Sequence, residues 1–215
     1  MVRNSFALKL RPHQMYSFGQ VLHENWYAIT GKFDALNVSN FSMWNAEDLI
    51  FGYFETIEPI SKWADEDKDF FVKLNQKFDG CYDWISEPWE PMRLMYQDFG
   101  IVREDKELIR HRVFMTKLVP GSEEEYKRRH DALVDARKGI NPGPDSNFSI
   151  WNAGGYIFGY DEIDTTMERE RTDADRQADI AWETKMLEIM SWITDDVDWI
   201  THEHHPHVRR ICYHG

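Results

Sequence analysis

The spacing of apolar and polar residues changes several times along the chain, and the clearest example lies in its second half. Residues 111–118 alternate apolar and polar side chains, which predicts a strand. After a turn at Pro120 and Gly121, helical spacing runs from Ser122 to about Lys138. We expect a hairpin formed by residues 148–151 and 156–163. A long helical segment at 165–194 and a closing strand at 207–213 follow it.

The first half repeats this order and contains close copies of two segments. Residues 39–55 align with residues 146–162 at a constant offset of 107, and twelve of the seventeen pairs are identical. Residues 6–10 align with residues 114–118 at an offset of 108. The remaining spacing predicts the same series of elements, with strands at 4–10 and 91–97, helices at about 14–30 and 60–80, and a hairpin at 40–57.

The duplicated order β-α-β-β-α-β predicts an α+β protein built from two fused ferredoxin-like repeats. We expect residues 1–105 to form repeat 1 and residues 106–215 to form repeat 2, with 98–110 joining them. Helices cover one face of each sheet, and the other face also needs cover. The two sheets are therefore expected to face each other as an intramolecular dimeric α+β barrel.

Composition narrows the possible partners. The formal net charge of −13 argues against nucleic acids and anionic membranes. The start of the chain has no apolar signal region and no long uncharged span follows, so a soluble, cytoplasmic protein is expected. Nine tryptophans fit either cores or a pocket for a small molecule. Cys81 and Cys212 are expected to be free thiols, and the chain to be a monomeric pseudo-dimer or to pair further.

Tyr126 and His130 are the first candidates for chemistry. They lie four residues apart on the predicted helix, on the face that continues to Leu133 and Val134. This face is apolar and points inward, so the pair is either a hydrogen-bonded core pair or part of a site. The basic residues between them are expected to point toward solvent: Lys127, Arg128 and Arg129.

The strand at 148–151 offers further candidates. Alternation places Asn147 and Trp151 on one side of it and Phe148 on the other. Asn147 or Trp151 could bind a polar, flat ligand. Both recur in the first half as Asn40 and Trp44, so a structural role in both repeats is equally open.

Residues 201–207 contain four histidines, a residue type that often binds metals. Their spacing matches no standard zinc motif, and an extended backbone sends alternate side chains apart. We therefore predict no metal site here and leave open that one or two of these histidines line a pocket mouth.

Four segments of the second half, in this order, resemble motifs of the L-rhamnose mutarotase family. Glu-Tyr-Lys-Arg-Arg-His at 125–130 is similar to its first-helix motif, and Asn-Phe-Ser-Ile-Trp at 147–151 to its Asn-Tyr-x-Ile-aromatic strand. Trp182 with Lys185, Met186 and Met190 resembles its second-helix motif, and residues 208–213 its final strand. Family members are small ferredoxin-like chains that pair into dimeric α+β barrels, so the resemblance implies a fused dimer here.

The resemblance implies roles for individual residues. His130 falls at the catalytic proton-donor position, and Tyr126 and Trp182 fall at sugar-binding positions. Phe148 stands where the family has a sugar-binding Tyr, and Glu183 stands where it has a second Trp. These two departures bear on the substrate more than on the type of reaction.

The first half departs further from the family. Gly19 or Phe18 meets the Tyr position, and Leu22 or His23 meets the His position, depending on where a one-residue gap is placed. Phe70 meets the Trp position. Repeat 1 is therefore expected to have lost the site and to serve as a structural partner.

The implied reaction interconverts the anomers of a reducing sugar, such as L-rhamnose, L-fucose or another 6-deoxy hexose. It needs an acid at the ring oxygen and a base at the anomeric hydroxyl, but no cofactor. A histidine suits the acid role, and Glu183 is a possible base or hydroxyl acceptor. Two alternatives stay open: a non-catalytic sugar-binding or scaffold protein, and a monooxygenase-like enzyme, since such enzymes share this type of barrel.

Overall fold

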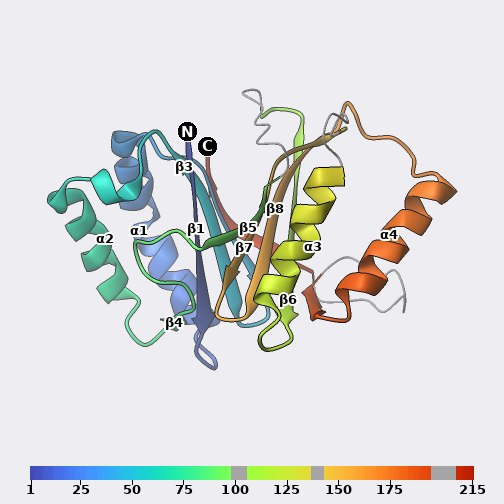
Figure 1. The fold of residues 1–215 in the computed structure, drawn as a ribbon. Coiled ribbons are helices and arrows are strands. Elements are labelled where there is room, and N and C mark those ends of the chain that lie inside the picture. Colours follow the sequence, from blue (N-terminus) through green and yellow to red (C-terminus); the bar gives the residue numbers. More distant parts are fainter. Residues whose placement is uncertain (98–105, 137–142, 195–206) are drawn as a thin grey trace. The chain divides into compact units, whose positions relative to one another are not determined.

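The computed structural model describes residues 1–97, 106–136, 143–194 and 207–215. The chain divides into two compact units. Unit 1 contains Met1–Met92 and Arg209–Gly215, and unit 2 contains Arg93–Val208. Among the described residues each unit has one five-stranded antiparallel sheet and two α-helices, which confirms the predicted α+β class and its ferredoxin-like repeats (Figure 1). The predicted face-to-face packing of the two sheets stays a prediction.

Unit 1 is a ferredoxin-like fold with one added strand. Its sheet has the order β10-β2-β3-β1-β4, of which the last four strands form the ferredoxin-like part. The elements are β1 (Val2–Leu10), α1 (Met15–Leu36), β2 (Ser39–Ala46), β3 (Leu49–Thr56), a short 3-10 helix η1 (Ile60–Lys62), α2 (Asp65–Lys77), β4 (Tyr82–Trp84) and β10 (Arg209–His214).

Unit 2 repeats this arrangement with the order β5-β7-β8-β6-β9. Its elements are β5 (Arg93–Gln97), β6 (Ile109–Leu118), α3 (Glu123–Ala136), β7 (Asp145–Ala153), β8 (Tyr156–Asp164), α4 (Asp173–Met186) and β9 (Met190–Thr194).

The two repeats exchange their last strands, an arrangement that local sequence patterns do not indicate. β5 comes from repeat 1 but pairs with β7, and β10 comes from repeat 2 but pairs with β2. The fourth strand of each ferredoxin-like fold is instead the shorter β4 or β9, which pairs with β1 or β6. The segments predicted at 91–97 and 207–213 are indeed strands, but the prediction that they close their own repeats is wrong.

The predicted helix at 165–194 is also too long. Thr172 caps the start of α4, because its side chain accepts a hydrogen bond from Asp175 N while the Asp175 carboxylate bonds back to Thr172 N. The helix ends at Met186, and the segment from Met190 pairs with β6. The apolar residues of β9 had continued the helical spacing by coincidence, and tertiary pairing decides their structure.

A close contact between a phenylalanine and a glycine on neighbouring strands explains why both repeats have these two residues at equivalent positions. A Cβ atom at Gly159 would lie 2.1 Å from the ring of Phe114 on the neighbouring strand, and one at Gly52 would lie 2.1 Å from the ring of Phe6. Only glycine lets these rings lie flat across the adjacent strand. In unit 2 the ring held in this way also contacts Phe148 and Trp192.

Cys81 and Cys212 are both free, as expected. Although they come from different repeats, both belong to the apolar core of unit 1, because β10 carries Cys212 into that sheet. Burial raises the pKa of the Cys212 thiol to about 12, so this thiol stays protonated at neutral pH. Among the described residues no helix is long and apolar enough to span a membrane.

Candidate functional site

The sheet of unit 2 divides the predicted site residues between its two faces. Phe148, on β7, belongs to the apolar cluster that contains Tyr126 of α3 and Trp182 of α4. Asn147 and Trp151 point to the opposite face, where they bond to residues of the sheet itself. The structure therefore gathers part of the predicted set on the helix side and leaves two members behind the sheet.

His130 is enclosed by aromatic rings. The Tyr126 ring stacks on its imidazole with centroids 4.3 Å apart, and Trp182 meets it edge-on at 5.0 Å. A third ring, Tyr96, approaches at 5.3 Å. Only 5% of His130 is exposed. The i, i+4 spacing on α3 places Tyr126 and His130 on one inward face, and α4 brings Trp182 against it.

This enclosure controls the protonation of His130. Burial lowers its pKa from 6.5 to about 4, although the hydrogen bond to the Tyr126 carbonyl opposes the shift. Nδ1 lies 3.0 Å from this carbonyl oxygen, which can only accept, so Nδ1 carries the proton of the neutral ring. Nε2 is then an unprotonated acceptor at neutral pH.

Glu183 is one of the buried acidic groups on the helix side. It lies next to Trp182 on α4 and is 7% exposed. The indole Nε1 of Trp192, on β9, donates a hydrogen bond to Glu183 Oε1 at 2.5 Å. Strand β9 thus holds one carboxylate oxygen in place, and it does so from a segment whose spacing had predicted a helix.

Arg112 adds positive charge beside Phe148. Its guanidinium lies 5.4 Å from the centroid of the Phe148 ring, a cation–π distance, and its Nη2 lies 3.1 Å from Asp161 Oδ2. The ion pair with a fully buried carboxylate fixes the direction of the arginine. Arg112 is a member of the site that sequence reasoning missed, although alternation along β6 puts it on the same face as Phe114.

Tyr96 is the second missed residue. It belongs to repeat 1 in the sequence, but β5 pairs with β7 and brings it opposite Ile150. Its ring contacts Phe148 with centroids 5.1 Å apart as well as His130. A phenol therefore lies against the ring of Phe148, at the position where the family resemblance implied that a tyrosine is missing.

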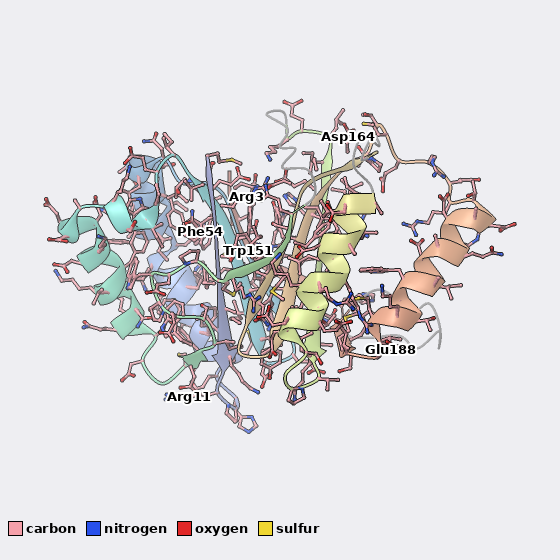
Figure 2. The ribbon with its side chains drawn as sticks, viewed as in Figure 1. Arg3, Arg11, Phe54, Trp151, Asp164 and Glu188 are labelled. Carbon is pink, nitrogen blue, oxygen red and sulfur yellow. The ribbon has the colours of Figure 1, made fainter. Side chains whose placement is uncertain are left out.

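Arg129 does not point toward solvent as predicted. It is 9% exposed, and its guanidinium bonds to Glu125, to the Lys185 carbonyl and to Glu188. Glu188, labelled in Figure 2, lies just after α4, so Arg129 ties α3 to the C-terminal end of α4. This side chain is inward because the C-terminal end of α4 lies beside it, a contact that helical periodicity cannot show.

Behind the sheet, Asn147 belongs to a buried polar triad. Asn147 Nδ2 donates to Glu162 Oε1 at 3.1 Å, and the Tyr160 hydroxyl donates to the same oxygen at 2.9 Å. Asn147 has φ of 50° at a bulge in β7, a conformation that asparagine tolerates well. Unit 1 repeats the triad with Asn40, Tyr53 and Glu55, so a role shared by both units explains this asparagine.

A protein-family model covers most of the second half of the chain. The model of the L-rhamnose mutarotase family matches residues 111–210, a segment that holds His130, Tyr126 and Trp182. Residues 111–210 are therefore similar to the L-rhamnose mutarotase family. No curated protein matches the chain.

One solved structure is similar in outline. It is described as "Putative monooxygenase" from Fusobacterium nucleatum subsp. nucleatum, with 9% identity, 88% of this chain and 87% of that chain covered, and a TM-score of 0.44. A likeness at this level gives no basis for transferring an activity.

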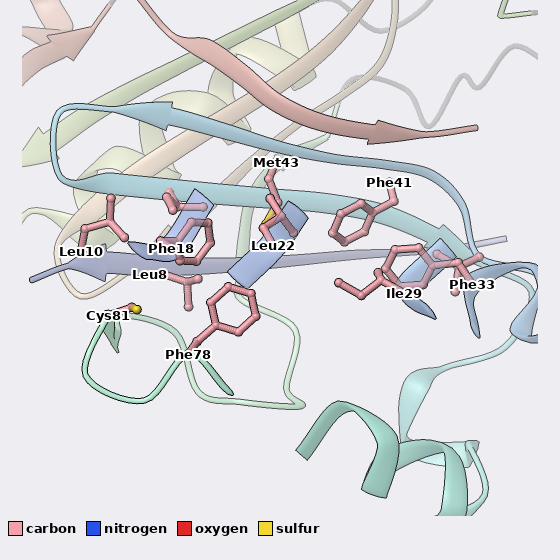
Figure 3. Close-up of a cluster of buried hydrophobic side chains, with 12 residues drawn as sticks. Leu8, Leu10, Phe18, Leu22, Ile29, Phe33, Phe41, Met43, Phe78 and Cys81 are labelled. Carbon is pink, nitrogen blue, oxygen red and sulfur yellow. The ribbon is translucent and has the colours of Figure 1, made fainter. Parts of the chain in front are cut away.

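The mutarotase-like positions of unit 2 have apolar counterparts in unit 1. β1 and β6 align at an offset of 108, and the pairings of β4 and β9 keep that offset. The same offset places Phe18 at the position of Tyr126 and Leu22 at that of His130. Both are buried, whereas Gly19 and His23 are exposed, so Phe18 and Leu22 are the counterparts (Figure 3).

Proposed function

We propose that this protein is an aldose mutarotase that interconverts the α and β anomers of a 6-deoxy hexose such as L-rhamnose or L-fucose. The observation that carries the proposal is His130, a buried and neutral histidine held by Tyr126 within the segment that matches the mutarotase family. Tyr126 and Trp182 contact its ring, and together with Glu183 they are the proposed sugar-binding groups.

The protonation of His130 favours a mechanism that begins with a base. Nε2 accepts the proton of the anomeric hydroxyl while the bond from C1 to the ring oxygen breaks and the aldehyde forms. The resulting imidazolium, whose pKa is lowered by burial, then gives the same proton to the ring oxygen. Rotation about the C1–C2 bond and the reverse steps yield the other anomer. One histidine can thus act first as base and then as acid, where the sequence had suggested a donor alone.

The aromatic groups suit a deoxy sugar. Phe148 and Trp182 offer apolar surface for the methyl group and for the C–H face of a pyranose. Glu183, oriented by Trp192, and the hydroxyl of Tyr126 provide polar groups for the sugar hydroxyls. Asn147 and Trp151, which we had included as sugar-binding residues, are replaced in this proposal by Arg112 and Tyr96 on the helix side.

The test is anomer exchange measured by saturation-transfer NMR on L-rhamnose, L-fucose, D-glucose and D-galactose. His130→Ala should lower the catalysed exchange rate by about 10²-fold or more, the usual contribution of a general acid–base group. His23→Ala, at an exposed position of α1, is the matched control and should leave the rate unchanged.

Two outcomes would replace the proposal. Background exchange of every sugar by the intact protein, with binding retained, would favour the non-catalytic sugar-binding protein. A loss of activity in His23→Ala but not in His130→Ala would mean that the chemistry takes place in unit 1 and not in unit 2.

A further inference from the structure

Unit 1 contains a cavity where unit 2 has its histidine. Its volume is about 270 Å³, and it lies between α1, α2, the segment after β4 and the helix side of the sheet. Phe18 and Leu22, the counterparts of Tyr126 and His130, are part of its wall. Four tryptophans complete much of the remaining wall: Trp26, Trp63, Trp84 and Trp89.

The wall of this cavity is apolar but incompletely covered. No side chain of α2 is buried, although Phe71, Val72 and Leu74 of this helix line the cavity. Val72 is 42% exposed and Trp89 is 40% exposed. Apolar side chains that converge on a cavity and still meet water are stabilised when an apolar molecule displaces this water.

The charges at the cavity limit what can enter. Among the described lining residues the charged side chains are Glu87 and Glu90, and both are exposed near Trp89. Two carboxylates disfavour an anion such as a fatty acid or a sugar phosphate. The Tyr82 hydroxyl donates to Asn75 within the wall, which leaves its oxygen able to accept a hydrogen bond from a ligand.

The size of the cavity narrows the choice further. A dry apolar cavity of roughly 150 Å³ holds one benzene ring, so about 270 Å³ corresponds to two fused rings. We propose that unit 1 binds an uncharged aromatic compound of about the size of naphthalene, at the position where unit 2 has its histidine. This second site does not depend on the mutarotase activity of unit 2.

The test uses 1-naphthol as probe and 1-naphthoate as its anionic counterpart. Titration calorimetry on the full chain should show one saturable site for 1-naphthol, with 1-naphthoate at least about tenfold weaker because of the two glutamates. Val72→Asp should weaken 1-naphthol binding by at least about tenfold, since it puts a charge on the apolar wall. Val72→Trp should weaken it by filling the cavity.

The matched control is Ile180→Asp, on α4 of unit 2, because Ile180 and Val72 are both 42% exposed. Ile180→Asp and His130→Ala should each change the affinity for 1-naphthol by less than about twofold. Absence of saturable binding, equal affinity for the two probes, or equal effects of Val72→Asp and Ile180→Asp would each overturn the proposal.

Discussion

Units 1 and 2 share the face of the sheet that bears the polar triad and differ on the face that the helices cover. The triad of Asn, Tyr and Glu is the same in both, down to the carboxylate oxygen that accepts both hydrogen bonds. On the helix side, His130 and Tyr126 of unit 2 are replaced in unit 1 by Leu22 and Phe18. The fold thus keeps its buried polar groups in both copies, while the helix face is free to change its chemistry.

The shared triad gives the largest expected effect. Glu162→Ala and Glu55→Ala should each lower the free energy of unfolding by about 3–5 kcal/mol, because each removes a buried carboxylate that accepts hydrogen bonds from a tyrosine hydroxyl and an asparagine amide. Urea denaturation would measure this. A large loss for one variant and none for the other would mean that the two triads are not equivalent.

Acid should weaken unit 2 through His130, a group that unit 1 lacks. The unfolded chain protonates this histidine near pH 6.5 and the folded chain only near pH 4, so its contribution is complete above 6.5 and is lost as the pH falls toward 4. The loss should reach about 3 kcal/mol. His130→Gln should remove this part of the pH dependence in denaturation experiments between the two values. An unchanged pH profile in the variant would contradict the buried neutral histidine.

Substitutions at the two glycines that contact phenylalanine rings should lower stability to a similar extent but should differ in their effect on anomer exchange. Gly159→Ala and Gly52→Ala should each cost about 1–3 kcal/mol, since the added methyl group displaces a packed ring. Thermal unfolding would show this. Only Gly159→Ala should also lower anomer exchange, because Phe114 supports Phe148 and Trp192. Equal effects of both variants on exchange would argue against a site in unit 2 alone.

The smallest effect concerns the choice of sugar. Phe148→Tyr adds one hydroxyl next to Tyr96 and should change the relative affinity for two sugars by about 0.5–1.5 kcal/mol, the value of one hydrogen bond. Competition between L-rhamnose and L-fucose, followed by NMR, would reveal it. Phe41→Tyr, at the equivalent position of unit 1, is the control and should leave the preference unchanged.

Most helices and strands could be predicted from local patterns in the sequence. Alternation located the hairpins, and the i, i+4 spacing put Tyr126 and His130 on one inward face, where the structure has them stacked. The duplicated segment indicated two units of one fold. These features depend on residues close together in the chain, so a single sequence reveals them.

Other parts of the site depend on pairings between distant segments. Tyr96 reaches His130 because β5 pairs with a strand that lies about fifty residues later, and Arg129 is buried because α4 ends beside it. The short strand β9 had the spacing of a helix, and its pairing with β6 overrode that tendency. No local pattern distinguishes these outcomes from their alternatives.

Because the repeats exchange strands, neither repeat contains all the strands of its own sheet. A cut between the repeats would separate Tyr96 from His130 by sending β5 away with the first fragment, and would remove β10 from the sheet that it completes. Each fragment would carry an edge strand that belongs to its sibling and would lack one of its own. A gene that encodes either repeat alone therefore specifies a sheet that lacks one of its edge strands.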